Sequence, residues 1–600
     1  MFIRRTATGR GPDGERYYTH RLVSTQRIGG KVRQRTLLNL GAHFAIERGH
    51  WGLLCQCVDE RLHGQSGLNL EAVPTAVEAE AERMTAQLLT RQRPASSQGA
   101  SATGDVQSVD IDSMTLTRPR SVGLEQLGLW AMAQVDFAGL LGDCGCNGPQ
   151  RGAAIGTIIA RMAAPGSEQA TYRWLRSRSA LGELLAYDYE TMDDMALYRI
   201  SDRLYRQRAW IEAALFERVR DLFGLECVIT LYDLTNTYFE GRAAGNPQAR
   251  HGHSKEKRSD CPLLTLAMVL DGSGFVRRSQ VFGGNAGEAN TLDAMLSGLD
   301  APAGALVVMD RGIASQANLD WLVERGYRYL VVSRERRRTF DAQAATPITT
   351  ASDERVHIQS VPSDNGQELY LYCHSEARAR KEEGIDRRFA ERFEAALQGI
   401  HDGLSKPRTT KRIDKLWERI GRLKEKSRGI GGHYDIELIP DDSGEKAVAL
   451  RWQRRATPNS RVSHPGVYCL RTNETDWDAD KLWRTYTMLT DLEAVFRSLK
   501  SELGLRPIYH HKQERSAGHL FISVLAYQFV QILRRCLREH GVTDRWGSLR
   551  ERMGGQCRIT ATFRRADGRT LHVRKTTQPE PAQKDIYAAL GIDAMPGGVR

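Results

Sequence analysis

The chain has 600 residues, a mass of 67.3 kDa and a formal net charge of +12, with 41% hydrophobic residues and ten cysteines. The length predicts several domains. The basic balance, with a pI of about 9.2, favours a polyanionic partner. The first ten residues lack the apolar stretch of a secretory signal, so we expect a cytoplasmic protein with reduced, mostly buried thiols.

For the first 120 residues the sequence predicts small secondary-structure elements and gives little indication of their function. Residues 17–40 alternate into two strands around Gly29-Gly30, which indicates a small β-module over residues 1–63. Its arginines either contact DNA or only solvate the surface. For residues 64–120 we expect a helix over 71–92 and then a linker over 93–118, because that stretch is rich in Ser, Ala, Gly and Asp.

A succession of amphipathic helices follows, and we assign residues 121–224 to a helical DNA-binding domain. Ser167 has the position of an N-cap for the helix that follows it. Arg173 and Arg176 on that helix are candidate DNA contacts, although such arginines often only solvate a surface.

Two aspartates then follow segments that have the sequence pattern of a β-strand. Asp233 directly follows a short apolar run, where an ionised side chain is costly unless something such as a metal pairs with it. Asp310 follows a second apolar run and precedes a helix that Ser315 caps and Gly326 ends. Strand, aspartate, turn and helix place this carboxylate at the C-terminal end of a strand, where open α/β sheets bind their ligands.

The elements around these two aspartates predict one mixed α/β layer over residues 225–334. Residues 263–282 predict two strands around the turn at 271–274, residues 290–299 a helix, and residues 327–334 a further strand. Three adjacent strands, a helix, a strand, a helix and a strand resemble the RNase H arrangement.

Residues 335–477 predict an inserted domain with β structure and a projecting helical pair. The pair covers residues 376–426 and breaks at Pro407, and strands follow at 433–440 and 466–473. Basic runs occur at 334–338, 406–428 and 451–455, and we expect at least one of them to contact DNA. Trp452 lies among these arginines and is either a stacking platform for an unpaired base or a core side chain.

The most informative helix begins at about Asp480 and ends before Pro507. Tyr486, Glu493 and Lys500 are seven residues apart and therefore share one face, which Arg497 joins. A separate apolar stripe docks the helix on a core, and it consists of Leu489, Leu492, Phe496, Leu499 and Leu503. The polar face suits a metal-bound phosphodiester, and the alternative is a solvated, salt-bridged face.

Residues 478–600 divide at residue 545 into the second part of the core and a tail. The apolar run 519–533 is interrupted by polar residues and is too short for a membrane span, so we expect a buried core helix. The tail predicts a hairpin that turns at Asp567-Gly568. The C-x-C pairs at 55/57 and 144/146 do not have the spacing typical of zinc sites.

Four ordered motifs carry a resemblance to a known family: YDLTNTYFEG at 232–241, GHSKEKRSD at 252–260, MDRGIAS at 309–315 and FRSLKSELGLRPIYH at 496–510. They resemble DDE transposases of bacterial insertion sequences, in the insertion-sequence-four group and its subgroup numbered sixteen thirty-four. The group signature on the glutamate helix is Tyr, two residues, Arg, three residues, Glu, six residues, Lys. The chain matches it except that Leu489 holds the arginine position, where Arg497 or Arg484 is the candidate substitute.

The resemblance implies an RNase H-like core, in 225–334 and 478–545, in which Asp233, Asp310 and Glu493 hold two Mg²⁺ ions, with Mn²⁺ as a substitute. It implies cutting at the terminal repeats of an element and joining of the 3′-OH ends to target DNA. The residues that we expect to contact DNA are Tyr486, Arg497, Lys500, Lys255, Arg258, Arg311, Trp452, Arg173 and Arg176. The expected partner is double-stranded DNA, bound by a homodimer or higher oligomer in the bacterial nucleoid and not at a membrane.

Two other functions remain open from the sequence. One is an RNase H-like DNA nuclease that cuts without strand transfer. The other is an inactive DNA-binding remnant, against which the intact set of three carboxylates argues.

Overall fold

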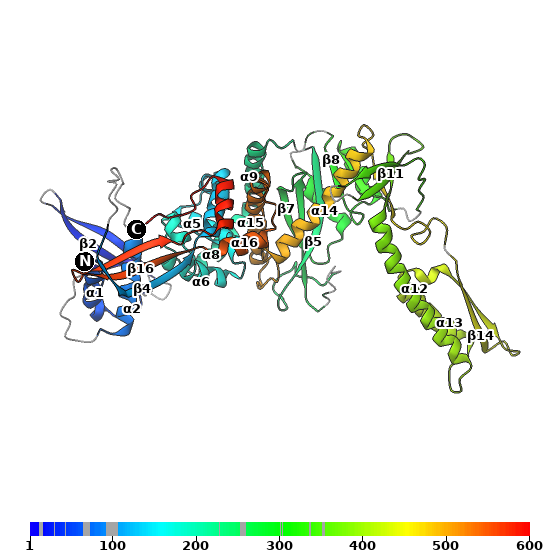
Figure 1. Ribbon diagram of the computed structural model, residues 1–600, viewed down its shortest axis with the longest axis horizontal. Coiled ribbons are helices and arrows are strands. Elements are labelled where there is room, and N and C mark those ends of the chain that lie inside the picture. The colour runs from blue at the N-terminus through cyan, green and yellow to red at the C-terminus, as the bar shows by residue number, and fades with distance from the viewer. Residues whose placement is uncertain are drawn as a thin grey trace.

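The computed structural model describes residues 1–10, 16–28, 31–41, 44–63, 73–91, 106–226, 228–252, 258, 260–299, 302, 304–334, 338–350, 354–455 and 457–599. The molecule is elongated (Figure 1). A small N-terminal module lies at one end, a helical region and a large sheet follow, and a long arm projects at the other end.

The N-terminal module is an antiparallel sheet covered on one face by two helices. The strands β1 (Phe2–Arg10), β2 (Arg16–Ile28) and β3 (Lys31–Gly41) pair in that order, which confirms the predicted hairpin. The helices α1 (Trp51–His63) and α2 (Thr75–Arg91) share a core with the sheet through Leu22 and Leu38. This core extends to Leu88 on α2, past residue 63 where we expected the module to end.

The expected linker over residues 93–118 is wrong in its second half. β4 (Val109–Ser121) pairs with β16 (Cys557–Arg565), which pairs with β17 (Thr570–Thr576) in the predicted C-terminal hairpin. β4 was missed because it is largely polar and partly exposed, and its partner strand is more than 400 residues away. Residues 92–105 lie outside the described part of the chain.

A bundle of helices surrounds one long apolar helix, as predicted for residues 519–533. The central helix α15 (Gln513–Glu539) packs against α3, α5 and α8. The surrounding helices are α3 (Gly123–Gln134), α4 (Phe137–Asp143), α5 (Gly148–Ala163), α6 (Glu168–Ser177), α7 (Leu181–Leu185), α8 (Met195–Arg206), α9 (Arg208–Phe223), α16 (Trp546–Gly554) and α17 (Pro581–Leu590). Ser167 caps α6 as expected, by accepting a hydrogen bond from the Ala170 backbone N–H at 3.3 Å.

The length and composition of α15 match those of a membrane-crossing helix, contrary to our expectation that the apolar run is too short. The helix extends six residues beyond that run on each side. Its whole apolar window is nevertheless buried inside the fold. α15 is therefore a core helix, and the helices around it cover its apolar side chains.

The central sheet has nine strands in the order β10-β11-β12-β15-β9-β8-β5-β6-β7. β5 (Ile229–Tyr238), β8 (Leu306–Met309) and β9 (Arg328–Val332) are parallel to one another, and β6 (Leu263–Asp271) and β7 (Val276–Gly283) extend the sheet antiparallel from β5. Three short helices connect these strands: η3 (Glu288–Thr291), α10 (Leu292–Leu296) and α11 (Gln316–Glu324). Every strand expected between residues 227 and 334 is present.

The segment expected as an inserted domain over residues 335–477 is divided between the same sheet and the arm. β10 (Thr346–Thr349), β11 (Arg355–Pro362), β12 (Leu369–Ser375) and β15 (Val467–Thr472) continue the nine-stranded sheet beyond β9. An insertion that donates strands to its host sheet shares the host's core, so these residues are not a separate domain.

The arm leaves the sheet between β12 and β15 and projects far from it (Figure 1). It consists of α12 (Glu376–Leu404), α13 (Ile413–Lys426) and the pair β13 (Tyr434–Pro440) and β14 (Ala447–Arg454). Phe393, Leu397, Ile420 and Leu450 form its own small core. The predicted helical pair and its interruption around Pro407 are confirmed.

Glu212 lies at the contact between the helical bundle and the sheet. The carboxylate is on α9 and accepts hydrogen bonds from the backbone N–H of Ser279 on β7, at 3.0 Å, and from the Ser279 hydroxyl. Burial outweighs these hydrogen bonds and raises the pKa of Glu212 to about 7. The side chain therefore holds a proton in the folded protein over a pH range where it would be ionised in the unfolded chain.

We expect the contribution of Glu212 to the stability of the protein to fall as the pH rises from about 4 to about 7, because its ionisation is favoured only after unfolding. The full effect corresponds to about 3 kcal/mol. Glu212→Gln keeps both hydrogen bonds with Ser279 and cannot ionise. Urea unfolding of both proteins across this pH range should show a stability difference that widens in favour of the variant up to about pH 7. A constant difference would contradict the raised pKa.

Candidate active site

Asp233 and Asp310 occupy adjacent positions on two neighbouring parallel strands. In the register of β5 and β8, Tyr232 is paired with Met309, and each aspartate is the next residue along its chain. Asp233 is half-buried inside β5, and Asp310 is exposed directly after β8. Neighbouring strands are about 4.8 Å apart, so the two backbones hold these carboxylates side by side.

The alternation of side chains places both aspartates on the same face of the sheet. Tyr232 and Met309 belong to the core on one face, with α10 and α11, whereas Leu231 and Val308 belong to the core on the other. Because successive side chains of a strand point to opposite faces, Asp233 and Asp310 share the face of Leu231 and Val308. The helix α14 covers that face.

Glu493 is presented by this helix, α14 (Ala479–Ser501), which packs across β5, β8 and β9 (Figure 1). The side chain of Asp478 caps the helix by accepting a hydrogen bond from the Lys481 backbone N–H at 2.7 Å. The predicted apolar stripe is packed in the core that lies on this face of the sheet. Glu493 itself is exposed. The stripe therefore fixes the helix on the sheet and leaves the carboxylate open to a ligand.

Tyr486 lies two turns before Glu493 and is affected electrostatically by both Asp310 and Glu493. Burial, together with the smaller effect of the two carboxylates, raises the pKa of its phenol to about 12. The ring is 6.3 Å from that of Tyr468 on β15. Tyr486 is therefore a neutral hydroxyl at physiological pH, close to the position where these carboxylates gather.

The turn after Asp310 is held by two arginines. The Asp310 carboxylate accepts a hydrogen bond from the backbone N–H of Arg311 at 2.6 Å. The Arg311 guanidinium donates to the Arg334 carbonyl at 2.9 Å, and Arg334 donates to the carbonyls of Arg311 and Gly312. Arg334 thus belongs to the support of this turn, although the sequence indicated it only as part of a basic run.

The other candidate DNA contacts near the sheet differ in their surroundings. Arg258 forms a two-pronged ion pair with Asp260 at 2.8 Å and lies over the ring of Tyr238. Arg497 is exposed on α14, and Lys500 near the end of that helix is half-buried. Lys255 lies outside the described residues.

The remaining candidates are not brought to the carboxylates. Arg173 and Arg176 are exposed on α6 in the helical bundle, and Arg176 donates to the hydroxyl of Tyr172 at 2.9 Å. Trp452 is on β14, toward the far end of the arm (Figure 1), where it packs half-buried against the arm core with its ring 6.2 Å from that of His401. Among the substitutes considered for the arginine missing at Leu489, Arg484 pairs with Asp480 at 2.8 Å.

Two charged residues near the carboxylates were not singled out from the sequence. Arg378, in the first turn of α12, lies over the Tyr468 ring at 4.7 Å and lowers the pKa of Tyr486. Glu288 lies against Gly312, so closely that a Cβ atom at Gly312 would be 2.0 Å from a Glu288 carboxylate oxygen. Local sequence periodicity does not mark Arg378 or Glu288, because contacts between distant parts of the chain bring them close to the carboxylates.

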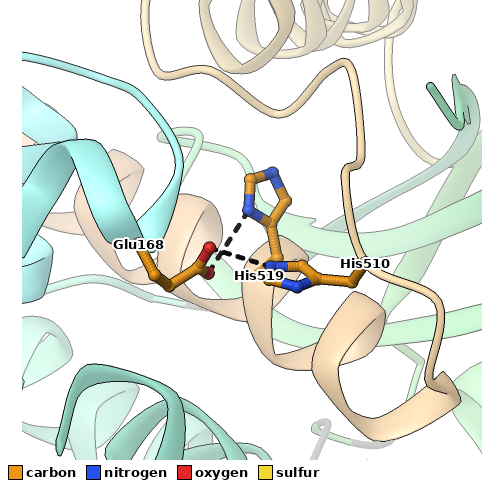
Figure 2. Close-up of side chains that lie close together, drawn as sticks. All are labelled: Glu168, His510 and His519. Atoms are coloured by element: carbon orange, nitrogen blue, oxygen red, sulfur yellow. Dashed lines mark ion pairs between the residues drawn. The ribbon is translucent and has the colours of Figure 1, made fainter. Parts of the chain in front are cut away.

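A second polar cluster lies in the helical bundle and consists of Glu168, His510 and His519 (Figure 2). The Glu168 carboxylate is 2.9 Å from Nε2 of His510 and 3.7 Å from Nδ1 of His519. Among the described residues, these three are the only His, Cys, Asp or Glu group whose ligand atoms all lie within 4.8 Å of one another. The sequence analysis missed this cluster because His510 and Glu168 are more than 340 residues apart.

Arg161 argues against a metal at this cluster. Its guanidinium nitrogens are 3.1 Å from Nδ1 and 3.4 Å from Nε2 of His519, and it also donates to the Gly504 carbonyl at 2.9 Å. Burial, followed by the positive charge of Arg161, lowers the pKa of His519 to about 4. Hydrogen bonds from both histidines outweigh burial and hold the pKa of Glu168 well below its usual range. The cluster is therefore a buried carboxylate that contacts two imidazoles and interacts electrostatically with Arg161.

A family model described as a transposase DDE domain matches residues 229–529, half of the chain. The match begins at β5 and ends within α15, so it spans both aspartates, the arm and α14. No curated protein matches the chain.

Proposed function

The chain belongs to the DDE transposase family, and from that premise we propose that Asp233, Asp310 and Glu493 are its metal-binding carboxylates. The function is DNA transposition by cutting and strand transfer, a phosphoryl transfer that depends on divalent metal ions. The observation that carries the assignment is the register of β5 and β8, which sets the two aspartates side by side under α14.

The order of the sheet supports an RNase H-like core. Strands β5 to β9 are the first to fifth strands of this region in the chain. In the sheet they lie in the order 3-2-1-4-5, with β5, β8 and β9 parallel. The glutamate helix crosses the face on which both aspartates lie. Strands β10, β11, β12 and β15 and the arm are then additions between the second aspartate and the glutamate.

The proposed cofactor is a pair of Mg²⁺ ions, for which Mn²⁺ substitutes. Three carboxylates provide the hard oxygen ligands that Mg²⁺ prefers. Asp233, Asp310 and Glu493 would hold the ions, which would activate the attacking oxygen and stabilise the leaving one.

The residues around the carboxylates have distinct roles in this proposal. The Arg311 backbone N–H and Arg334 orient Asp310 toward the face covered by α14. Tyr486 stays protonated because of its raised pKa, so its hydroxyl can donate a hydrogen bond to a phosphate oxygen. Arg497 and Lys500 hold the phosphates of the cut strand along the same helix face, and Arg258 and Arg311 neutralise phosphates at the ends of β5 and β8.

The finer assignment is to the insertion-sequence-four group, subgroup sixteen thirty-four, supported by the four ordered motifs and by Tyr486, Glu493 and Lys500. Arg497 is the proposed substitute for the arginine missing at Leu489, because it is exposed while Arg484 is paired with Asp480. The enzyme acts on the two ends of its element as a homodimer or higher oligomer, in the bacterial cytoplasm at the nucleoid.

An end-joining assay tests this function. A duplex that carries the element end with a recessed or free 3′-OH is incubated with the protein, Mg²⁺ and a supercoiled plasmid. A transposase joins the 3′-OH to the plasmid, whereas a nuclease without strand transfer only cuts the duplex. A protein that does neither in Mg²⁺ or Mn²⁺ would be the inactive remnant.

We expect Lys500→Ala to weaken binding to the element end more than it slows cleavage. Removing one phosphate contact should lower the slope of log K against log salt by about 0.9. Cleavage should recover at low salt, because the metal-binding carboxylates are unchanged. Gel shifts and cleavage at graded salt measure both effects. Lys481→Ala is the matched control, since Lys481 is on the same helix but lies over the Trp477 ring, about five turns from Lys500. An unchanged salt slope in Lys500→Ala would contradict the contact.

A further inference from the structure

More than half of the net charge of the protein lies in its first 41 residues. This segment contains nine Lys or Arg and two Asp or Glu, against a net charge of +12 for the whole chain. All nine basic residues are in β1, β2 and β3, and these strands contain no acidic residue. Such a concentration of positive charge without partners of opposite sign in the same strands is the electrostatic pattern of a nucleic-acid contact.

One face of this sheet is committed to the core, and the other carries long polar side chains. Leu22 and Leu38 pack against α1 and α2. On the opposite face, Arg4 is paired in register with Arg21, and the Arg4 guanidinium donates a hydrogen bond to the Gln34 side-chain oxygen at 3.1 Å. Arg4, Arg21 and Gln34 are exposed. The amide of Gln34 is thereby oriented on an open surface.

The same open face exposes two large apolar side chains. Phe2 is 37% exposed and Val32 is 62% exposed. Phe2 precedes Arg4 by two residues on β1, and Val32 precedes Gln34 by two residues on β3, so each lies on the face of its neighbour. In the major groove a guanidinium group recognises guanine, a side-chain amide recognises adenine, and an apolar side chain contacts the methyl group of thymine.

The hairpin of β2 and β3 also extends beyond the three-stranded part. β1 begins opposite Val23, whereas β2 and β3 continue to pair from Ser24 and Arg35 to Ile28 and Lys31. This two-stranded extension, the β2–β3 ribbon, has about five residues per strand and is about 17 Å long. A two-stranded ribbon fits the major groove, which is about 12 Å wide. The ribbon projects from the end of the molecule remote from the arm (Figure 1).

We propose that the open face of the β1–β3 sheet and the β2–β3 ribbon read base pairs in the major groove of double-stranded DNA. That this DNA is the terminal repeat of the element rests on the proposed function. The recognition surface is then separate from the carboxylates, which lie on the central sheet beyond the helical bundle (Figure 1). Sequence choice belongs to Arg4, Arg21, Gln34 and Val32, and the α6 arginines contribute phosphate contacts only.

Selection of duplexes from a pool of random sequence tests the proposal, with the intact protein at moderate salt. The wild-type protein should enrich one motif. Gln34→Ala should lose the preference at one position of it, with about a tenfold or greater drop in discrimination there. Arg21→Ala should relax a different position. Gln34→Arg, which restores a long donor, should change the preferred base instead of removing the preference. The control is Arg538→Ala, an exposed arginine at the end of α15.

Three outcomes overturn the proposal. The first is that Gln34→Ala and Arg21→Ala enrich the wild-type motif unchanged. The second is that both variants weaken binding to all sequences equally, which would show that these residues contact only phosphates. The third is a loss of the motif in Arg173→Ala instead, which would return recognition to α6. Metal-dependent joining by the wild-type and Arg538→Ala proteins is measured in the same series, so a failure of this proposal is distinguishable from a failure of the catalytic assignment.

Discussion

We expect the Asp310→Asn protein to lose cleavage of element-end DNA while it still binds that DNA. The substitution keeps the size of the side chain and its ability to accept the Arg311 N–H, but removes the charge that holds a divalent ion. Loss of the several kcal/mol that metal ions contribute to the transition state corresponds to about 10²–10⁴-fold in rate. Binding should stay near the wild-type level or tighten, because a negative charge facing phosphate has gone.

Both effects can be measured on one duplex, by gel shift and by Mg²⁺-dependent cleavage. Asp320→Asn is the matched control, since Asp320 is an exposed aspartate on α11, the helix that follows Asp310 in the chain. The control should cut at the wild-type rate. Asp233→Asn and Glu493→Gln should behave as Asp310→Asn does. Wild-type cleavage by Asp310→Asn would show that this carboxylate does not hold the metal.

The second large effect is expected on stability, from Glu168→Ala. The substitution removes the buried carboxylate whose charge favours the ionised guanidinium of Arg161, which is 3% exposed, and it leaves His510 and His519 without their shared acceptor. Leaving a buried charge uncompensated in this way typically costs about 3–5 kcal/mol. Glu514→Ala is the matched control on α15, because its ion pair with Arg206 is exposed on both sides and should contribute less than about 1 kcal/mol.

Urea unfolding at pH 7 measures the loss, and a pH series tests its origin. The pKa of His519 is lowered from about 6.5 to about 4, so the folded state resists protonation of this imidazole. The contribution of His519 to stability should therefore fall as the pH drops from about 6.5 to about 4, and the contribution of Glu168, whose pKa is lowered, should fall at still lower pH. Equal stability of Glu168→Ala and Glu514→Ala would show that the cluster does not hold the bundle together.

The fold of the catalytic region could be predicted from the sequence because its elements are marked locally. Apolar runs of β-branched residues precede Asp233 and Asp310, and the stripe on α14 has a helical period. Ser167, Ser315 and Gly326 correctly indicated helix ends. These signals lie within a few residues of the feature that they predict.

The features that escaped prediction depend on contacts between distant parts of the chain. β4 is polar, and only pairing with β16 makes it a strand. The strands after Arg334 join the central sheet through the pairing of β15 with β9, which no local pattern indicates. Glu168 meets His510 only after the bundle closes around α15. For the same reason the sequence could give the three carboxylates but not their surroundings, such as Glu288 and Arg378.

The most direct test of the central claim is to locate the bound metal by iron-induced backbone cleavage. Fe²⁺ replaces Mg²⁺ in the protein, and ascorbate with peroxide then generates hydroxyl radicals that cut the chain next to the ion. Cuts near residues 233, 310 and 493, suppressed by excess Mg²⁺ and absent in Asp310→Asn, are the result expected for metals held by β5, β8 and α14. Cuts near residues 168, 510 and 519 instead would place the metal in the helical bundle and contradict the assignment.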